Sequence, residues 1–485
     1  MTQQALIGID IGTSSVKAVM AASDGTVLAR FGQGYATERP ASGAALQAPE
    51  DWVALVMAAL DRFARHPDAA GVVAIGITSQ VNTHVFCDAA GMALAPAITW
   101  QDTRAAPDGA TLDARITTAD KTRALGAPIP IDASHALARM ALVARTAPEV
   151  WAATRAVMLP KDYVIARLTG EVLADPLAAV GLVGADLGYA DAVLGLIPEA
   201  AALLPPLRDP LEPAGRVRPG LPFAGVPVAV GTMDAWASMF GLGVAREGEA
   251  MYLSGSSEVL GLISTLRTGA PGPVTFPEWR GITLHAAPTQ AGGASLDWLS
   301  GLLGRDAASL DTLSSPVRIG RASPLFLPHL EGERAPLWDP QSRGAFAGLN
   351  SATGPAEMTA AVMEGVAFSA RLALESLEAS GGRRIEALAL GGGGARSDSW
   401  NRLRADALGR PLRRIAAPES GALGALVMAG VACGQIATLE DATHSLVATD
   451  ATYEPDPGRA ALADERFAHF RQLYASLCPI HHAMT

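Results

Sequence analysis

Two segments of this chain share one pattern, which constrains the fold more than any other feature. Near the N-terminus an apolar run, Ala5–Asp10, meets a turn of Gly, Thr and Ser and continues as a second apolar run, Val16–Met20. The pattern recurs at Met251–Leu253, Ser254–Ser257 and Val259–Ile263. Short apolar runs joined by Gly/Ser turns predict antiparallel strand pairs. We therefore expect two related halves, each beginning with such a hairpin.

The length of 485 residues also favours two domains, because one hydrophobic core rarely serves so long a chain. The second hairpin follows a glycine-rich stretch, Gly241–Gly248. The expected division is residues 1–243 and 244–485.

Charge and composition exclude several classes of function. A net charge of −11 argues against binding to nucleic acid, which needs clustered Lys and Arg. The three cysteines have no zinc-type spacing, and their odd number is typical of a reducing compartment. Every apolar run is interrupted by charges, Gly or Pro, and the first residues lack a basic and apolar leader. We expect a cytoplasmic protein with no membrane partner.

The remaining elements are expected from periodicity and turn residues. Val72–Thr78 reads as a buried strand that continues at Val85-Phe86 beyond a polar break, and Val226–Val230 reads as another strand. Helices are expected from Pro49, within 134–170, and at Glu357–Leu377, Ser397–Leu408, Ser420–Val431 and Ala460–Leu477, with a strand at Ile385–Leu390.

The first hairpin carries the motif Asp10–Lys17, with Gly12, Thr13 and Ser14 in its turn. Backbone N–H groups and hydroxyls in such a turn can bind an anion, and the carboxylate at the strand end can hold Mg²⁺. An ordinary β-turn uses the same residue types. The second hairpin, with Gly255 and Ser256, makes the phosphate-binding interpretation stronger, because the two loops form a pair.

Gly391–Gly394 follows a strand and precedes a helix, which lets a nucleotide approach the backbone closely. The run lacks the spacing of a dinucleotide-binding fingerprint, since Arg396 stands where the last glycine should be. A Walker A loop is excluded because no Gly-Lys pair exists, and the protein-kinase signatures are absent.

Asp234 follows the strand Val226–Val230 and precedes a helix. Phosphoryl transfer needs a base near the accepting hydroxyl, and this carboxylate could serve. Capping of the helix N-terminus is an equally good interpretation of an Asp there. The polar break Gln80–His84 and the cluster Trp100–Arg104 could form a wall that hydrogen-bonds a polyhydroxylated substrate.

At these residues the sequence resembles the FGGY carbohydrate kinases, over essentially the whole chain. The most specific segments are Ile9–Ser14, Leu159–Tyr163 with Leu168–Glu171, Gly332–Pro336 and Gly392–Ser397. Within that family, Leu159–Tyr163 and Gly392–Ser397 look more like xylulokinases than glycerol kinases. The resemblance implies a two-domain α/β fold of the actin/hexokinase (ribonuclease H-like) type with an interdomain cleft, and a possible homodimer.

The resemblance also implies ATP as the phosphoryl donor, Asp234 as the catalytic base, and Mg²⁺ held at Asp10 and Asp234. The implied nucleotide-binding positions are Gly12, Thr13, Ser14, Lys17, Gly255, Ser256, Gly293, Asp297, Gly393, Gly394 and Asp398. The implied substrate positions are Gln80, Val81, Asn82, Trp100, Asp234 and Ala235.

The departures from the family pattern fall on the substrate. Xylulokinases typically have Gln-Met-His-Gly where this chain has Gln80-Val81-Asn82-Thr83, and an Asn where it has Ala235. The expected reaction is phosphorylation of D-xylulose to D-xylulose 5-phosphate. The alternatives are a kinase for another ketopentose, such as ribulose, or for a polyol, such as glycerol or erythritol, and a catalytically silent sugar-sensing protein.

Overall fold

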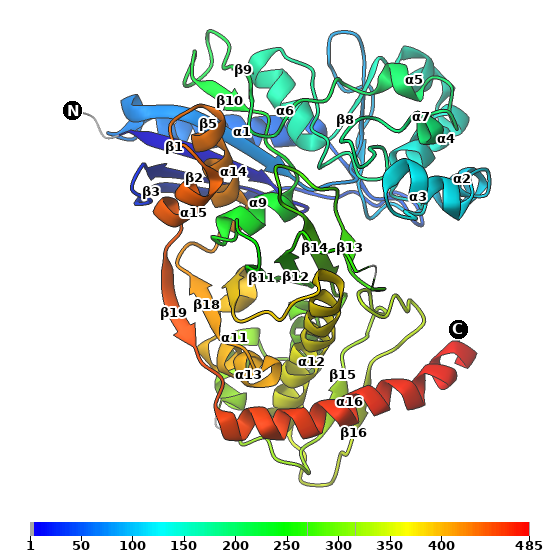
Figure 1. Ribbon diagram of the computed structural model, residues 1–485, viewed down its shortest axis with the longest axis vertical. Coiled ribbons are helices and arrows are strands. Elements are labelled where there is room, and N and C mark those ends of the chain that lie inside the picture. The colour runs from blue at the N-terminus through cyan, green and yellow to red at the C-terminus, as the bar shows by residue number, and fades with distance from the viewer. Residues whose placement is uncertain (1–3, 269, 316, 485) are drawn as a thin grey trace. The chain divides into compact units, whose positions relative to one another are not determined.

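The structure is a computed structural model that describes residues 4–268, 270–315 and 317–484 (Figure 1). The chain divides into two compact units. Unit 1 comprises Met1–Gly243 and Glu419–Val447, and unit 2 comprises Val244–Pro418 and Ala448–Thr485. In the described part of the chain, no helix has the length and apolar character needed to cross a membrane.

Unit 1 is built on a six-stranded sheet in the order β3-β2-β1-β5-β10-β9. The first three strands form the expected antiparallel meander, and β5 and β10 then add in parallel. The strands are β1 (Ala5–Ile11), β2 (Ser15–Ala22), β3 (Val27–Gly34), β5 (Val72–Ser79), β9 (Pro213–Arg216) and β10 (Pro227–Ala229).

Helices and short strands complete unit 1. The amphipathic helix α1 (Pro49–Ala64) buries Trp52, Val56 and Phe63 in a core shared with the isoleucines of β1. The other helices are α2 (Ala106–Asp113), α3 (Thr118–Leu125), α4 (Ala136–Thr146), α5 (Pro148–Ala153), α6 (Pro160–Thr169), α7 (Asp191–Leu194), α8 (Ala200–Leu203), α9 (Asp234–Gly241), α14 (Ser420–Ala432) and α15 (Leu439–Leu446). The short strands are β4 (Leu46–Gln47), β6 (Val85–Cys87), β7 (Ala97–Ile98) and β8 (Ala156–Met158).

The late segment Glu419–Val447 belongs to unit 1 because α14 packs against β1, β5 and α9. These contacts are made backbone to backbone through glycine. A Cβ at Gly8 would lie 1.9 Å from the Ala422 carbonyl oxygen, and a Cβ at Gly424 would lie 1.6 Å from the Ala237 carbonyl oxygen. The first segment of unit 1 ends at Gly243, and the sequence pattern did not indicate the return of α14 and α15 to this unit.

Unit 2 repeats the strand arrangement of unit 1. Its seven-stranded sheet has the order β13-β14-β12-β11-β17-β18-β19. An antiparallel meander is again followed by two parallel strands, here β17 and β18. The strands are β11 (Ala250–Ser254), β12 (Glu258–Ile263), β13 (Val274–Thr275), β14 (Leu284–Pro288), β17 (Leu388–Gly391), β18 (Leu412–Ile415) and β19 (Thr449–Tyr453). The matching order supports the expectation of two related halves.

The helices of unit 2 pack around a shared core. One of them is α12, the longest helix that the sequence predicted in this half. The helices are α10 (Gly293–Leu303), α11 (Ala307–Ser314), α12 (Pro355–Gly381), α13 (Asp398–Leu408) and α16 (Pro457–Met484). A small separate sheet contains β15 (Leu325–Leu327) and β16 (Ala345–Ala347). The C-terminal helix α16 packs against α13 and β15 (Figure 1).

Two expectations for the secondary structure need correction. Val85-Phe86 does not continue β5; it forms β6, which pairs with β8 in a separate sheet because the polar break after Ser79 turns the chain away. The strand expected at Ile385–Leu390 begins only at Leu388. The expected N-cap at Ser397 is confirmed, since its side chain accepts a hydrogen bond from the Trp400 N–H.

We predict that Gly424→Ala destabilises unit 1 strongly. The new Cβ would collide with the carbonyl of Ala237, which is helix backbone and cannot move alone. We expect a loss of about 3 kcal/mol or more, which lowers the thermal midpoint by roughly 6–12 °C for a domain of this size. The control is Gly32→Ala, an exposed position where a Cβ would meet nothing within 4 Å. Equal midpoints for the two variants, measured by calorimetry, would contradict this packing.

Candidate active site

The first hairpin loop is held in place by three side chains of unit 1. Its turn closes with a hydrogen bond from the Gly12 N–H to the Ser15 carbonyl (3.1 Å). The Tyr35 hydroxyl donates to the Gly12 carbonyl, and the Gln47 amide donates to the Thr13 carbonyl (2.8 Å). The Trp100 indole N–H donates to Thr13 Oγ1 (3.1 Å). Thus the loop is rigid where the sequence predicted phosphate binding, and the structure brings the predicted Trp100 to it.

Asp10 lies at the end of β1 beside this loop. Burial raises the pKa of Asp10 to about 6. The positive charge of Lys17, which pairs with Asp10 across β1 and β2, lowers this pKa by a smaller amount. Its Oδ1 is buried without a hydrogen-bond partner among the described residues. Gly421 in the first turn of α14 also approaches it, since a Cβ there would lie 2.6 Å from Asp10 Oδ2. The carboxylate is therefore poised to accept a ligand.

Asp234 is the first residue of α9, and Met233 before it is the N-cap residue. The chain reaches this point through Gly231, whose positive φ of 62° and close approach to the Ile77 carbonyl exclude other residues. Burial and, to a smaller extent, the negative charge of Asp10 together raise the pKa of Asp234 to about 7. Backbone N–H groups of Asp234 and Ala235 act in the opposite direction. The two carboxylates predicted to bind metal are thus close enough for the charge of Asp10 to raise the pKa of Asp234.

The predicted substrate wall follows β5. Gln80 is buried, donates to Gln47 Oε1 (2.8 Å) and keeps its own Oε1 unpartnered among the described residues. Asn82 adopts a positive φ of 54° and donates to Ser134 Oγ (3.2 Å). Val81 and Ala235 are half-buried, and Trp100 is 42% exposed. These side chains include no charged group.

Sequence reasoning missed the buried network behind this wall. The Lys161 ammonium lies 2.5 Å from Asp162 Oδ1 and 2.8 Å from Asp175 Oδ2, and all three side chains are fully buried. Asp175 also accepts from the Thr232 hydroxyl (2.6 Å), two residues before Asp234. The Lys161 N–H donates to Ser79 Oγ (3.1 Å). The network therefore ties the ends of β5 and β10 to α6.

Two other polar candidates near the wall have structural partners. Asp102 is buried and pairs with Arg104 (2.7 Å), so this part of the Trp100–Arg104 cluster is internally satisfied. Burial and the charge of Arg139 hold the pKa of His84 well below its usual value. His84 lines a small cavity of about 30 Å³ together with Asn82 and Asp175. A neutral, buried His84 is consistent with a structural position rather than a proton carrier.

The second hairpin loop, in unit 2, is also closed by a backbone hydrogen bond, which spans one residue fewer than in the first loop. The Gly255 N–H donates to the Ser257 carbonyl (3.0 Å), and Ser256 is exposed at the tip. Helix α10 begins directly on this loop, because the Gly293 N–H donates to the Gly255 carbonyl (2.9 Å). Asp297, one turn further along α10, is exposed. The predicted residues on this side therefore adjoin one another.

The glycine turn after β17 approaches the second loop closely. A Cβ at Gly394 would lie 2.2 Å from Ser254 Oγ, whereas Gly393 has open space around it. Asp398 begins α13 and pairs with Arg414 (2.7 Å). It lines a cavity of about 510 Å³ between α11, α12, α13 and α16. Gly394 therefore lies against the second hairpin, whereas Asp398 lines the cavity.

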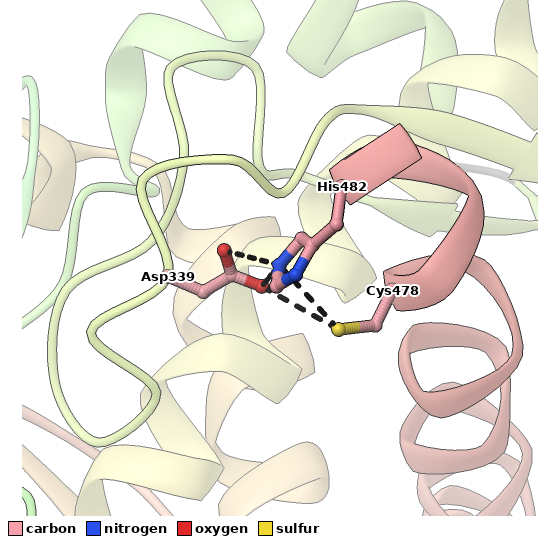
Figure 2. Close-up of side chains that lie close together, drawn as sticks. All are labelled: Asp339, Cys478 and His482. Carbon is pink, nitrogen blue, oxygen red and sulfur yellow. Dashed lines mark hydrogen bonds and ion pairs between the residues drawn. The ribbon is translucent and has the colours of Figure 1, made fainter. Parts of the chain in front are cut away.

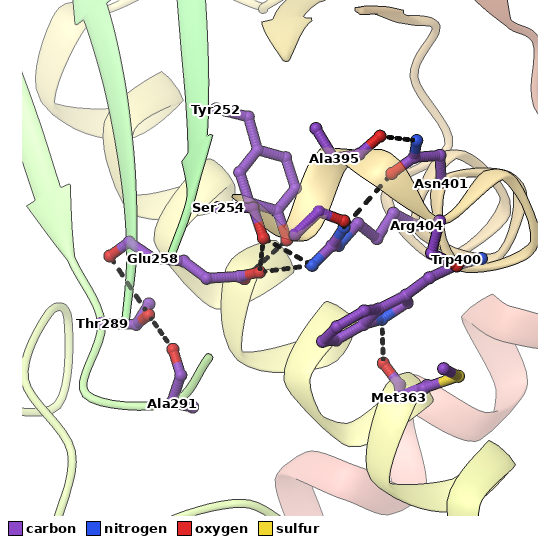
Figure 3. A network of polar contacts seen from close by, with 12 residues as sticks. Tyr252, Ser254, Glu258, Thr289, Ala291, Met363, Ala395, Trp400, Asn401 and Arg404 are labelled. Carbon is purple, nitrogen blue, oxygen red and sulfur yellow. Dashed lines mark hydrogen bonds and ion pairs between the residues drawn. The ribbon is translucent and has the colours of Figure 1, made fainter. Parts of the chain in front are cut away.

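A second buried ion pair, Arg404 with Glu258, joins these parts of unit 2 (Figure 3). The Arg404 guanidinium donates to Glu258 Oε1 (2.9 Å), Ser254 Oγ (2.7 Å) and the Gly394 carbonyl (3.0 Å). The Tyr252 hydroxyl donates to the other Glu258 oxygen (2.6 Å). The pair therefore fixes the second hairpin relative to the glycine turn. Neither residue was singled out from the sequence.

We predict that Arg404→Met destabilises unit 2 by about 3–5 kcal/mol, because Glu258 would remain buried without its cation. Adding Glu258→Gln should recover part of this loss by removing the unpaired charge. The control is Arg321→Met, which breaks the exposed ion pair with Glu465 and should leave the urea unfolding midpoint unchanged. Equal effects of the two arginine substitutions would refute the role of the buried pair.

Comparisons with known proteins agree with this geometry. Residues 5–241 match the model of the N-terminal domain of the FGGY family of carbohydrate kinases, and residues 268–433 match its C-terminal domain. The xylulose kinase of Escherichia coli K12 is 30% identical over 98% of this chain and 99% of its own length.

Solved structures show the same fold. A Brucella ovis structure described as a xyloylose kinase superposes with a TM-score of 0.87, at 28% identity over 99% of this chain and 100% of the other. Plasmodium falciparum glycerol kinase with ADP superposes equally well (0.87) at 17% identity over 98% of each chain, which shows the shared fold alone. The two-domain α/β fold is thus of the actin/hexokinase-like type, and the protein is a carbohydrate kinase that belongs to the FGGY family.

Proposed function

We propose that this kinase transfers the γ-phosphoryl group of ATP to a primary hydroxyl of D-xylulose and forms D-xylulose 5-phosphate, with Asp234 as the general base. The observation that carries the base assignment is the position of Asp234. It stands half-buried at the start of α9, directly after a strand of the central sheet and in the electrostatic neighbourhood of Asp10. Ligands of open α/β sheets bind at such strand ends.

Asp234 would accept the proton of the sugar hydroxyl while the oxygen of that hydroxyl bonds to phosphorus. Phosphoryl transfer depends mostly on positioning and charge stabilisation. The Lys161 network and the Gly231 turn support the proposal, since both fix the backbone that carries Asp234. A carboxylate held near a hydroxyl in this way contributes a rate factor of about 10²–10⁴.

The donor set of unit 1 fits Mg²⁺. Asp10 and Asp234 supply carboxylate oxygens, which Mg²⁺ prefers, and Asp10 Oδ1 has no protein partner in the described part of the chain. These two residues would hold the ion. When bound, it would neutralise negative charge on the ATP phosphates.

The nucleotide would be bound by loops and turns that present backbone N–H groups. Gly12, Thr13, Ser14 and Lys17 in unit 1 would bind phosphates, as would Gly255 and Ser256 in unit 2. The remaining proposed contacts, on the nucleoside side of unit 2, are Gly293, Asp297, Gly393, Gly394 and Asp398. Both loops are held by side chains behind them, which supports binding with little reordering.

The proposed acceptor is a neutral, polyhydroxylated ketopentose. The wall offers amide groups from Gln80 and Asn82, an indole from Trp100 and small apolar surfaces at Val81 and Ala235. The E. coli relative named xylulose kinase supports xylulose as the first candidate. A polyol such as glycerol is the second candidate, because the side chains of Gln80, Val81, Asn82, Trp100 and Ala235 carry no charge that would select a particular sugar.

We predict that Asp234→Asn lowers kcat by a factor of about 10²–10⁴, because an amide cannot accept the hydroxyl proton. The matched control is Asp61→Asn, which alters an exposed carboxylate on α1 and should leave kcat unchanged. Turnover is measured as ADP formation with saturating ATP and acceptor. An Asp234→Asn variant that folds normally and keeps near-wild-type kcat would exclude Asp234 as the base.

Substrate choice is tested by a panel of acceptors. We predict that kcat/KM is highest for D-xylulose among D-xylulose, D-ribulose, erythritol and glycerol, because the uncharged wall offers amides to several hydroxyls. ADP formation is measured for each acceptor at fixed ATP. A higher kcat/KM for a polyol would replace xylulose with the second candidate and leave the Asp234 assignment intact.

A further inference from the structure

The C-terminal helix carries two metal-binding side chains that face a third residue of unit 2. Cys478 and His482 stand on successive turns of α16, at i and i+4, so they lie on one face of the helix. Both point toward Asp339 in the loop before β16 (Figure 2). Asp339 is buried, and the thiol and imidazole are more accessible. We call Asp339, Cys478 and His482 the C-terminal clasp.

We propose that the C-terminal clasp binds one Zn²⁺ ion through a thiolate, an imidazole and a carboxylate. The inference goes beyond the kinase function and does not depend on it. These three ligand types are those that Zn²⁺ takes in proteins.

The separations between the ligand atoms carry the proposal. Zn²⁺ bonds of about 2.3 Å to sulfur and about 2.0–2.2 Å to nitrogen and oxygen, in tetrahedral geometry, place ligand atoms about 3.4–3.6 Å apart. In the clasp Cys478 Sγ lies 3.6 Å from His482 Nε2 and 3.8 Å from Asp339 Oδ2, and His482 Nε2 lies 3.0 Å from the same Asp339 Oδ2. Each separation is within about 0.4 Å of that geometry.

Hydrogen bonding alone explains the clasp less completely. An Asp339–His482 ion pair would account for the 3.0 Å contact but gives no reason for the thiol to join it. A thiol is a weak donor, so its contacts to Asp339 Oδ2 (3.8 Å) and His482 Nε2 (3.6 Å) are weak hydrogen bonds. A cation that all three atoms share gives each of them a strong partner.

The surroundings of Asp339 are those of a positioned metal ligand. The carboxylate accepts from the Gln341 N–H (3.0 Å), the Ser342 N–H (3.1 Å) and the Tyr474 hydroxyl (3.0 Å). In metal sites, hydrogen bonds of this kind orient the side chains that bind the metal directly. The fourth coordination position would be filled by water, which suits the exposed side of the clasp.

The helix itself gives a physical reason for such a clasp. Pro479 stands inside α16 between the two ligands, and it lacks the N–H that would bond to the carbonyl one turn earlier. The last turn is therefore held less strongly by the helix backbone. A metal bridge to Asp339 would fix that turn to the body of unit 2.

The clasp also connects to the second hairpin loop. Asp339 and Glu333 exchange backbone hydrogen bonds (2.9 Å each). The neighbouring Arg334 donates to Ser257 Oγ (3.1 Å) and to the Thr289 carbonyl (2.6 Å). Bound metal would therefore stabilise the loop that supports the second hairpin.

The test is metal binding by the full-length protein after chelation and gel filtration. Co²⁺ is added as the spectroscopic probe and is then displaced by Zn²⁺. We expect a thiolate-to-cobalt charge-transfer band in the near ultraviolet and visible bands of tetrahedral intensity, both saturating at one Co²⁺ per chain. An ion at the proposed Asp10–Asp234 site would have no thiolate ligand and would give no such charge-transfer band. Cys478→Ser should abolish the charge-transfer band and weaken Zn²⁺ binding more than the roughly 10–100-fold that loss of an outer partner costs.

Two controls keep the result interpretable. Cys433→Ser removes another half-buried free thiol of the chain and should bind Zn²⁺ like the wild type. His482→Cys keeps three ligands and should bind Co²⁺ with a stronger charge-transfer band, from two thiolates. The proposal is wrong if the wild type shows no thiolate-to-cobalt band, or if Cys478→Ser and Cys433→Ser bind Zn²⁺ equally well.

Discussion

Both units depend on a buried cation that joins backbone segments behind the functional loops. In unit 1 Lys161 lies between Asp162 and Asp175, and Asp175 holds Thr232 beside Asp234. In unit 2 Arg404 joins the second hairpin to the glycine turn. Buried ion pairs add little net stability, yet breaking one leaves a charge without compensation. We expect these pairs to act mainly as positional constraints on the loops, because losing one partner would leave a buried charge unpaired.

A second constraint is the close packing of α14, which brings a late segment to the first strand. Small residues let the α14 backbone approach β1, β5 and α9 without intervening side chains. As a result the first turn of α14, at Gly421, reaches Asp10. A helix N-terminus favours a negative charge nearby, whereas burial disfavours it and raises the pKa of Asp10. The electrostatics of Asp10 thus depend on a segment some 400 residues further along the chain.

Local sequence predicted those parts of the molecule that local chemistry determines. Both hairpins, the helices at Pro49 and Glu357, and the Ser397 cap follow from turn residues, periodicity and capping. The return of α14 to unit 1 could not be predicted, since its signal is a set of glycine contacts that exist only after folding. Asp175 and Glu258 were missed for a similar reason, because a single acidic residue gives no sign of burial until its partner is known. Lys161 did leave a signal: it is one of only three lysines and comes shortly before the apolar run Tyr163–Ala166.

The same logic explains why the substrate is harder to infer than the chemistry. The loops and Asp234 are defined by backbone turns that few residue types permit. The wall at Gln80 depends instead on the direction of hydrogen bonds. The Gln80 amide N–H donates to Gln47, which leaves Gln80 Oε1 as a buried acceptor without a partner among the described residues. A buried acceptor strongly favours a ligand that supplies a hydroxyl and disfavours an analogue that lacks it. Under the proposed function, selectivity would rest on where a sugar places one hydroxyl, and Gln47, in the short strand β4, sets the direction of the Gln80 amide.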